Sequence, residues 1–144
     1  MKVSTKGRYA LRLMVDLAMN DNGENISLKE VSERQEISVK YLEQIISMLN
    51  RAGYVKSERG SNGGYRLTRK PEEYTVGMIL RLTEGSLAPV GCVEEGSEFC
   101  DRYGNCVTFS VWKKISDAID NVVDNVTIAD LVAEQRERIN DYVI

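Results

Sequence analysis

Three cysteines are the residues of this 144-residue chain best suited to chemistry. Cys92, Cys100 and Cys106 lie in one glycine-dotted stretch, and the chain contains no other cysteine. Clustered cysteines in a chain without secretory features are more often metal ligands or redox thiols than structural disulfides. Iron–sulfur clusters usually take four thiolates, and zinc also takes four ligands. The spacing therefore predicts a cluster, a metal site or redox thiols; three reduced thiols in a flexible loop are the alternative.

Three cysteines leave one position of a four-ligand site unfilled. A carboxylate of the same loop is one source of the fourth ligand. A carboxylate of a partner subunit and an exogenous ligand are others. The candidates in the loop are Glu94, Glu95, Glu98 and Asp101.

The chain contains no histidine. This absence removes the commonest general base near neutral pH and the commonest protein metal ligand. It also excludes a Ser-His or Cys-His nucleophile pair within the chain. We therefore expect a protein that is not an enzyme.

A second group of residues suits contact with nucleic acid. Residues 38–53 have the pattern of a helix, with Ser38 as a favourable N-cap and Gly53 where a C-cap belongs. Apolar residues at helical spacing mark a side that must be buried: Val39, Leu42, Ile45, Ile46 and Leu49. The other side carries groups that can contact phosphates and base edges, without an evident partner inside the fold: Lys40, Tyr41, Glu43, Gln44, Ser47 and Arg51. An ordinary amphipathic surface helix is the alternative.

A basic hairpin is predicted after this helix. Residues 54–57 and 65–68 alternate apolar and polar residues, as half-buried strands do, and the glycines at 63–64 suit a turn. Arg59 precedes Gly60 at the tip, where an arginine can enter a narrowed minor groove. A reading helix followed by a glycine-tipped basic wing is typical of DNA-binding proteins, whereas the alternative is a plain surface hairpin.

Other helices are predicted to support these two elements. Residues 4–19 have the pattern of one helix, and residues 27–35 form a short helix that begins with an S-x-x-E capping box. Together with residues 38–53 they give the helix-turn-helix pattern, whose second helix enters a major groove. Residues 75–85 form a further helix, which we expect to pack under the wing.

Charge is divided between the two halves of the chain. Residues 1–70 contain 13 Lys and Arg against 8 Asp and Glu, a balance of +5, whereas residues 71–144 contain 6 against 14, a balance of −8. This division suggests a nucleic-acid face and a separate face with another role; chance clustering is the alternative. No apolar run is long enough to span a bilayer and no signal-peptide core is present, so we expect a cytoplasmic protein without membrane contact.

The acidic half contains a long apolar stripe that begins after the last cysteine. Its residues recur at helical spacing from position 107 onward: Val111, Ile115, Ala118 and Val122, joined by Trp112 and Ile119. This half is too short to bury the stripe alone. We expect a partner helix, most simply from a second copy of the chain. Thr127 and Asp130 resemble the capping box of a last helix, and the apolar tail 139–144 is expected to pack on a neighbour.

Several motifs together carry a family resemblance. They are residues 4–10 (STKGRYA), residues 37–44 (ISVKYLEQ), the glycine-rich tip with Arg59, and Trp112 after the cysteine loop. In these motifs, and over nearly its whole length, the chain resembles the IscR/NsrR/CymR family of winged-helix transcriptional regulators. The resemblance is closest to IscR, the iron–sulfur assembly regulator. The family also includes a nitric-oxide sensor, NsrR, and a cysteine-metabolism repressor, CymR.

The resemblance implies a mainly α fold with a small β-hairpin wing. It implies a winged helix-turn-helix plus a long dimerisation helix at residues 107–123, in a homodimer that binds near-palindromic operators on double-stranded DNA. The expected domains are a DNA-binding domain at 1–85, a linker and cluster loop at 86–106, and a dimerisation region at 107–144.

The resemblance also assigns residues to the DNA. It places Ser38, Lys40, Tyr41, Glu43 and Gln44 at the major groove, and Arg59 with Gly60 at the minor groove. The chemistry is suitable, because Gln can pair with adenine, Glu can accept from the cytosine amine, and Lys can bind phosphate or guanine.

Cys92, Cys100 and Cys106 match the three cysteines that ligate the cluster in cluster-binding members. The resemblance therefore implies an iron–sulfur cofactor, with [2Fe–2S] favoured over [4Fe–4S]. Phe109 stands where IscR-type members have a ligating histidine, and Arg8 stands where NsrR-type members supply an aspartate from the other subunit. Neither side chain can ligate iron, so the fourth ligand is unassigned and a labile, exposed cluster is expected.

These observations predict a homodimeric DNA-binding regulator, a repressor, whose operator binding is modulated by an iron–sulfur cluster. The alternative is a cluster-free regulator of the same fold that senses oxidants, zinc or a cysteine-metabolism partner through its thiols. An iron–sulfur carrier with a vestigial DNA-binding fold is a third hypothesis, from another class of protein.

Overall fold

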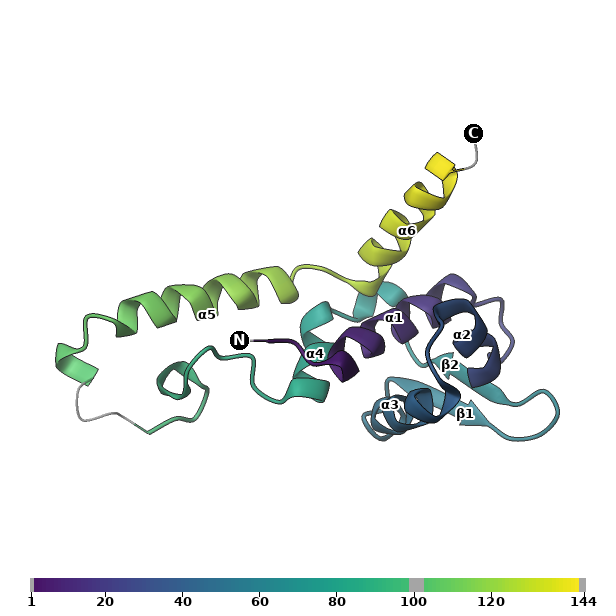
Figure 1. The fold of residues 1–144 in the computed structure, drawn as a ribbon, viewed down its shortest axis with the longest axis horizontal. Helices are drawn as coiled ribbons and strands as arrows, with labels where there is room; N and C mark the ends of the chain where they lie inside the picture. Colours follow the sequence, from purple (N-terminus) through teal and green to yellow (C-terminus); the bar gives the residue numbers. More distant parts are fainter. Residues whose placement is uncertain (1, 99–102, 143–144) are drawn as a thin grey trace.

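The chain forms a mainly helical body with one hairpin and one projecting arm (Figure 1). The structure is a computed structural model, and it describes residues 2–98 and 103–142. The elements of the body are α1 (Thr5–Met19), α2 (Leu28–Gln35), α3 (Val39–Arg51), β1 (Val55–Glu58), β2 (Gly64–Leu67), η1 (Pro71–Glu73) and α4 (Val76–Glu84). The elements that follow are η2 (Gly91–Val93), η3 (Tyr103–Asn105), α5 (Phe109–Val123) and α6 (Ile128–Tyr142). The predicted fold class, mainly α with a hairpin wing, is confirmed.

Hydroxyl side chains begin the helices where the sequence predicts them. The Oγ of Ser4 accepts from the amide of Gly7 at 3.0 Å, which satisfies a donor that the first turn leaves unpaired. Ser27 and Glu30 form the predicted reciprocal capping box of α2. The same pairing occurs at α6, where the amide of Asp130 donates to Oγ1 of Thr127 and the amide of Thr127 donates to the Asp130 carboxylate, both at 3.0 Å.

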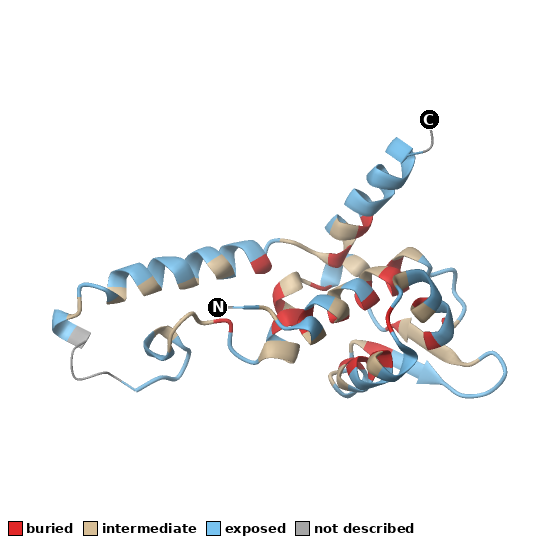
Figure 2. Ribbon diagram, in the orientation of Figure 1, coloured by how far each residue is buried: buried red, intermediate tan, exposed pale blue. Residues whose placement is uncertain are grey.

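One hydrophobic core fills the space between α1, α2, α3, the hairpin and the start of α6 (Figure 2). Its fully enclosed members include Leu13 of α1, Leu42 of α3 and Ile128 of α6. A smaller cluster joins Leu80, Leu87 and Val123 where α4 meets the end of α5. Apolar burial of this kind contributes about 25 cal/mol per Å².

The hairpin is antiparallel, with Val55 opposite Leu67 and Glu58 opposite Gly64. Buried Tyr74 fixes its base, because its hydroxyl donates to the carbonyl of Tyr54 at 2.7 Å and accepts from the amide of Arg69 at 3.0 Å. The wing is thus attached to the body by both packing and hydrogen bonds.

The predicted position of the fourth helix is wrong. α4 packs mainly on α1 rather than under the wing, and Figure 1 shows the two helices beside each other. Gly77 permits close approach to the end of α5, because a Cβ there would lie 2.3 Å from a carboxylate oxygen of Asp124. Apolar spacing predicted this helix and its amphipathic face, but not which neighbour covers that face.

α5 extends away from the body as an arm, with the cysteine loop at its far end (Figure 1). Its surface is mostly exposed or half-buried, and Val123 at its C-terminal end is buried. Among residues 2–98 and 103–142 we find no helix with the length and apolar character required to cross a bilayer.

Candidate nucleic-acid interface and cysteine loop

α3 is anchored by its apolar side and by both ends. Leu42, Ile45 and Leu49 are fully buried, and Ser38 caps the helix by accepting from the amide of Tyr41 at 3.2 Å. Ala52 is the C-cap, and Gly53 follows it at a φ of 78°. This glycine therefore occupies the position after the cap, where left-handed backbone closes a helix. Val39 departs from the prediction that the whole apolar stripe is buried, because it is 37% exposed in the first turn.

The polar side of α3 faces solvent at its N-terminal end. Ser38, Lys40, Glu43 and Gln44 are exposed. Within the described part of the chain, the side chains of Lys40, Glu43 and Gln44 make no hydrogen bond or ion pair. A solvent-facing acceptor, amide and ammonium on one helical face can address base edges and phosphates.

Tyr41 differs from these neighbours. Its half-buried ring lies edge-on to the ring of Tyr9, with centroids 5.6 Å apart and planes at 83°. The prediction that this side of the helix lacks partners inside the fold is therefore wrong for Tyr41. Since Tyr9 and Tyr41 lie on different helices, α1 and α3, no periodicity within either helix could have predicted the contact.

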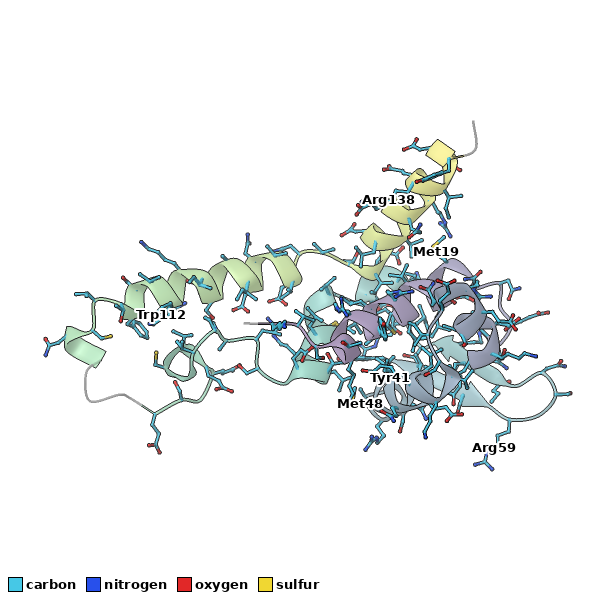
Figure 3. All side chains as sticks on the ribbon, in the orientation of Figure 1. Met19, Tyr41, Met48, Arg59, Trp112 and Arg138 are labelled. Atoms are coloured by element: carbon cyan, nitrogen blue, oxygen red, sulfur yellow. The ribbon has the colours of Figure 1, made fainter. Side chains whose placement is uncertain are left out.

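The wing presents Arg59 and Gly60 at its exposed tip. Figure 3 shows Arg59 pointing away from the body. Asn25 supports the tip, because its amide donates to Glu58 at 2.8 Å and to the carbonyl of Asn62 at 3.2 Å. Gly64 is required where the wing meets the body, since its φ is 149° and a Cβ would lie 2.5 Å from the carbonyl oxygen of Ile26.

The two described cysteines flank the far end of α5. Cys92, in η2, is exposed, and Cys106 is half-buried with its Sγ 3.2 Å from the hydroxyl of Thr108. Cys100 and the candidate ligand Asp101 lie outside the described residues. η2 packs on α5, so the loop and the start of the arm form one structural unit.

Phe109 occupies the neighbourhood of Cys92. Both line a hollow of about 250 Å³, together with Glu94, Glu98 and Lys113. A phenyl ring cannot replace a metal ligand, but the two carboxylates lie around the same hollow. Glu95, the remaining candidate ligand of the loop, is exposed. Arg8 is exposed on α1, with its guanidinium 6.0 Å from the Tyr9 ring centroid.

The donor set suits an iron–sulfur cluster, because cysteine thiolates are its usual ligands. Among the described side chains, no group of three or more His, Cys, Asp or Glu residues could hold a metal ion. The described part of the loop therefore carries ligand types that suit a cluster, but these side chains are not already gathered around one metal position.

The apolar stripe of α5 faces outward. Val111, Ile115 and Val122 are 47%, 40% and 61% exposed. The neighbouring side, with Trp112 and Ile119, is half-buried and faces the chain's own loop and α4. Charged side chains lie elsewhere on the helix, where Lys113 and Asp117 form an ion pair one turn apart.

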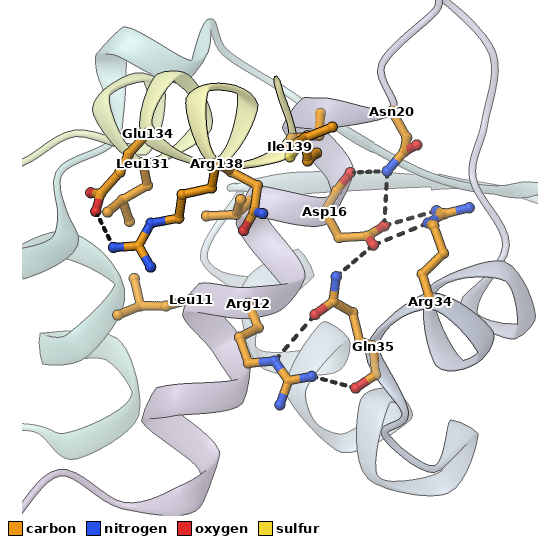
Figure 4. A pocket seen from close by; sticks show the side chains of 13 residues that line it. Leu11, Arg12, Asp16, Asn20, Arg34, Gln35, Leu131, Glu134, Arg138 and Ile139 are labelled. Atoms are coloured by element: carbon orange, nitrogen blue, oxygen red, sulfur yellow. Dashed lines mark hydrogen bonds and ion pairs between the residues drawn. The ribbon is translucent and has the colours of Figure 1, made fainter. Parts of the chain in front are cut away.

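Asp16 is a residue that sequence reasoning missed. Its side chain is 2% exposed on α1 and forms a bidentate ion pair with Arg34 of α2, through Nη2 at 2.8 Å and Nε at 3.1 Å. This hydrogen bonding raises the pKa of the Arg34 guanidinium above its ordinary value. The carboxylate borders a groove of about 690 Å³ between α1, α2 and α6 (Figure 4). The available signal was an acidic residue inside the apolar run of residues 13–19.

Comparison with known proteins gives consistent results. The model of the Rrf2 family, described as an iron-dependent transcriptional regulator, matches residues 3–134. The chain is similar to the transcriptional regulator IscR of Aliivibrio salmonicida, with 39% identity over 93% of this chain and 79% of the relative.

Two solved structures are similar over nearly the whole chain. T. potens IscR has 43% identity and a TM-score of 0.77, covering 96% of this chain and 90% of its own. The structure of CymR, the global cysteine regulator of B. subtilis, has 38% identity and a TM-score of 0.78, covering 93% of this chain and 98% of its own.

Proposed function

This chain belongs to the Rrf2 family of transcriptional regulators, and we propose that it is a homodimeric repressor whose operator binding is modulated by an iron–sulfur cluster on its cysteine loop. The family relationship and the structural neighbours identify a DNA-binding regulator rather than an enzyme. The cluster, the repressor role and the dimer are parts of the proposal.

The observation that carries the DNA part is the division of α3. One side is buried in the core, whereas the other presents Lys40, Glu43 and Gln44 to solvent. Ser38 and Tyr41 would contribute at the same end, and Arg59 with Gly60 would reach a minor groove. In this assignment α3 lies in the major groove and the first two turns of α3 read bases.

The proposed dimer rests on the exposed stripe of α5. A row of apolar side chains on a projecting arm is costly to leave in water, and a second copy supplies an identical row around a twofold axis. In a dimer the two α3 helices must lie one helical turn of DNA apart, about 34 Å, to engage both half-sites. Any change in the angle between the arms alters that spacing.

Cys92, Cys100 and Cys106 are the proposed ligands. The donor set favours iron–sulfur chemistry, with [2Fe–2S] favoured over [4Fe–4S]; such a cofactor would add sensitivity to oxidants and nitric oxide. Glu94 and Glu98 line the hollow beside Cys92, which makes them candidates for the fourth ligand. Because Cys106 is three residues from the first residue of α5, a rearranged loop would move the start of the arm.

Purification without oxygen tests the cofactor. The proposal expects a coloured protein with iron and sulfide, and loss of both in the Cys106→Ser variant. Colourless, iron-free protein from the same preparation would contradict it. The DNA part is tested with duplex DNA over a range of salt, where release of counterions requires affinity to fall steeply. Affinity that does not change with salt would contradict the assigned interface.

A cluster-free regulator of the same fold is the second candidate. Phe109 lining the hollow beside Cys92 favours it, as does the similarity to CymR, described as a global cysteine regulator. In this case the thiols would respond to oxidants, zinc or a cysteine-metabolism partner. Elemental analysis and thiol titration distinguish the two candidates, since zinc or fully titratable thiols would replace iron and sulfide.

The proposed functions divide the chain into three parts. Residues 1–85 would read DNA, residues 86–106 would carry the sensing loop, and residues 107–144 would hold the two copies together. In this proposal the sensing loop lies between the other two parts in the sequence and at the far end of α5 in the structure, so a rearranged loop would act on the arm that joins the two copies.

A further inference from the structure

We propose that Asp16 is a positioning residue for DNA reading, whose buried carboxylate fixes the turn between α2 and α3 and thereby the orientation of α3. The inference rests on the proposed placement of α3 in the major groove. It goes beyond that placement because Asp16 lies on α1, outside every residue assigned to the DNA.

The carboxylate is buried and fully bonded. Besides Arg34, it accepts from the side-chain amide of Gln35 at 2.9 Å, and the amide of Asn20 approaches it at 3.5 Å. The Asp16 carboxylate is 2% exposed while the Arg34 side chain is 37% exposed, so loss of these partners would leave a buried charge uncompensated on the Asp16 side of the pair. Asp16 therefore binds the C-terminal turn of α2 firmly to α1.

Gln35 transmits this constraint to the turn. Its amide donates to Asp16 while its side-chain oxygen accepts from Nε of Arg12 at 3.1 Å. Nη2 of Arg12 also donates to the backbone carbonyl of Gln35. The side-chain amide nitrogen, the side-chain oxygen and the backbone carbonyl of Gln35 are thus all hydrogen-bonded to residues of α1, as Figure 4 shows. We call Arg12, Asp16, Arg34 and Gln35 the Asp16 network.

The next residues form the turn itself. Glu36 adopts a left-handed conformation, with a φ of 56°, which a residue other than glycine occupies at some cost. The hydroxyl of Ser32 donates to the carbonyl of Ile37 at 2.6 Å, and Ile37 is buried. The strained conformation at Glu36 is thus held between fixed residues on both sides.

A second contact joins the network to α3. The guanidinium of Arg12 lies 5.3 Å from the centroid of the Tyr9 ring, and that ring is edge-on to Tyr41 in the first turn of α3. α1 therefore holds the N-terminal end of α3 by the turn and by an aromatic contact. This is the end that carries Lys40, Glu43 and Gln44.

The effect on recognition follows from lever geometry. α3 has 13 residues and so is about 20 Å long. If the turn no longer holds the N-terminal end of α3, a tilt of about 10° about its C-terminal end would displace the end that carries Lys40, Glu43 and Gln44 by about 3 Å, the length of a hydrogen bond. Base reading depends on such bonds, whereas nonspecific attraction to phosphates tolerates the displacement.

The test uses the full chain and two independent measurements. The wild-type protein first selects a duplex from a randomised pool. Affinity for the enriched duplex and for a scrambled duplex of equal length is then measured for each variant. Hydrogen–deuterium exchange of the amides of residues 36–41 is followed without DNA. The variants are Asp16→Asn, Gln35→Met, which keeps the Asp16–Arg34 pair, and Leu80→Ala, which removes buried apolar volume between α4 and α5.

For Asp16→Asn we expect the ratio of enriched to scrambled affinity to fall about tenfold or more, with scrambled affinity changed less than about twofold. Exchange at residues 36–41 should quicken by about tenfold. Gln35→Met should also lower the affinity ratio and quicken exchange at residues 36–41, each by less than Asp16→Asn does. Leu80→Ala should leave the ratio and the exchange at 36–41 near wild type.

Unchanged exchange at residues 36–41 in both Asp16→Asn and Gln35→Met would overturn the inference. So would an unchanged affinity ratio in variants with quickened exchange, or an equal loss of ratio in Leu80→Ala. Failure of the wild-type chain to enrich any duplex would count against the proposed function instead, and the exchange measurement would then decide whether the network fixes the turn.

Discussion

The body and the α5 arm differ in the kind of side chain that each leaves exposed to solvent. In the body, α3 and the wing have buried apolar faces, capped ends and hydrogen-bonded supports such as Tyr74 and Asn25. In the arm, α5 leaves Val111, Ile115 and Val122 exposed. The body leaves polar groups exposed, whereas the arm leaves apolar groups exposed.

The two kinds of exposed surface favour different partners. Exposed polar groups on a firmly held helix are stable in water and ready for a polar ligand such as DNA. Exposed apolar groups on a helix favour association with another apolar surface. In our proposal a single chain therefore reads DNA by its body, and it needs a second chain to place two such bodies on one operator.

Ile115→Glu should have the largest effect, because it should prevent the proposed dimer contact of α5 while leaving the body folded. A buried carboxylate in each subunit would prevent the two stripes from packing. Loss of the second half-site should then weaken binding to a selected operator by roughly 100-fold or more. Light scattering with size-exclusion chromatography measures the mass, and fluorescence anisotropy measures the affinity.

Asn121→Glu is the matched control, because it adds the same charge to the exposed polar side of α5. It should remain dimeric with near-normal affinity. A monomeric Asn121→Glu variant, or a dimeric Ile115→Glu variant, would show that another surface joins the subunits.

Gly64→Ala should instead lower the stability of the body. The left-handed φ of 149° and the contact of a Cβ with the Ile26 carbonyl leave no room for a side chain. We expect a loss of about 2–4 kcal/mol in the free energy of unfolding, measured by chemical denaturation. Gly60→Ala at the wing tip, where no atom lies within 4 Å of the added Cβ, should cost about 1 kcal/mol. Equal costs would mean that the base of the wing is not tightly held.

The sequence predicted the local elements well because their causes are local. Capping residues such as Ser27 and apolar spacing along α3 act within one or two turns, so they can be found by inspection. The exposed polar end of α3 followed from the same spacing. The outward stripe of α5 was expected for the same reason.

Contacts between distant segments were beyond this reasoning. Nothing in the spacing of the sequence shows that Asp16 pairs with Arg34. The contact between the rings of Tyr9 and Tyr41 is equally hidden. α4 likewise has one apolar face that could have packed on either the wing or α1. The exposure of Val39 shows a third limit, since a helix end can extend past the surface that buries the rest of its stripe.

Glu43→Ala tests whether the exposed end of α3 reads bases. It should change which base is preferred at one position in each half-site, with a loss of about 1–3 kcal/mol at the preferred base. Arg59→Ala should weaken binding broadly over many sequences, because a minor-groove arginine responds to groove shape and charge. Competition binding against a set of single-base operator variants measures both. Unchanged preference and affinity in both variants would contradict the assigned roles.

Arg81→Met should have the smallest effect, although it cuts the ion pairs that join body and arm. Arg81 of α4 pairs with Asp124 at 2.5 Å and with Asp120 at 2.9 Å on α5. All three side chains are 40–52% exposed, so solvent screens the attraction and the expected loss of unfolding free energy is below about 1 kcal/mol. The bond to Asp124 raises the pKa of the Arg81 guanidinium, which keeps it charged, so the loss should not depend on pH near neutrality but should shrink with added salt. Asp120→Asn keeps the Asp124 pair and should cost still less.

A loss of several kcal/mol in Arg81→Met would mean that body and arm are rigidly joined through this contact. The cysteine loop would then have little freedom to change the angle of the arm.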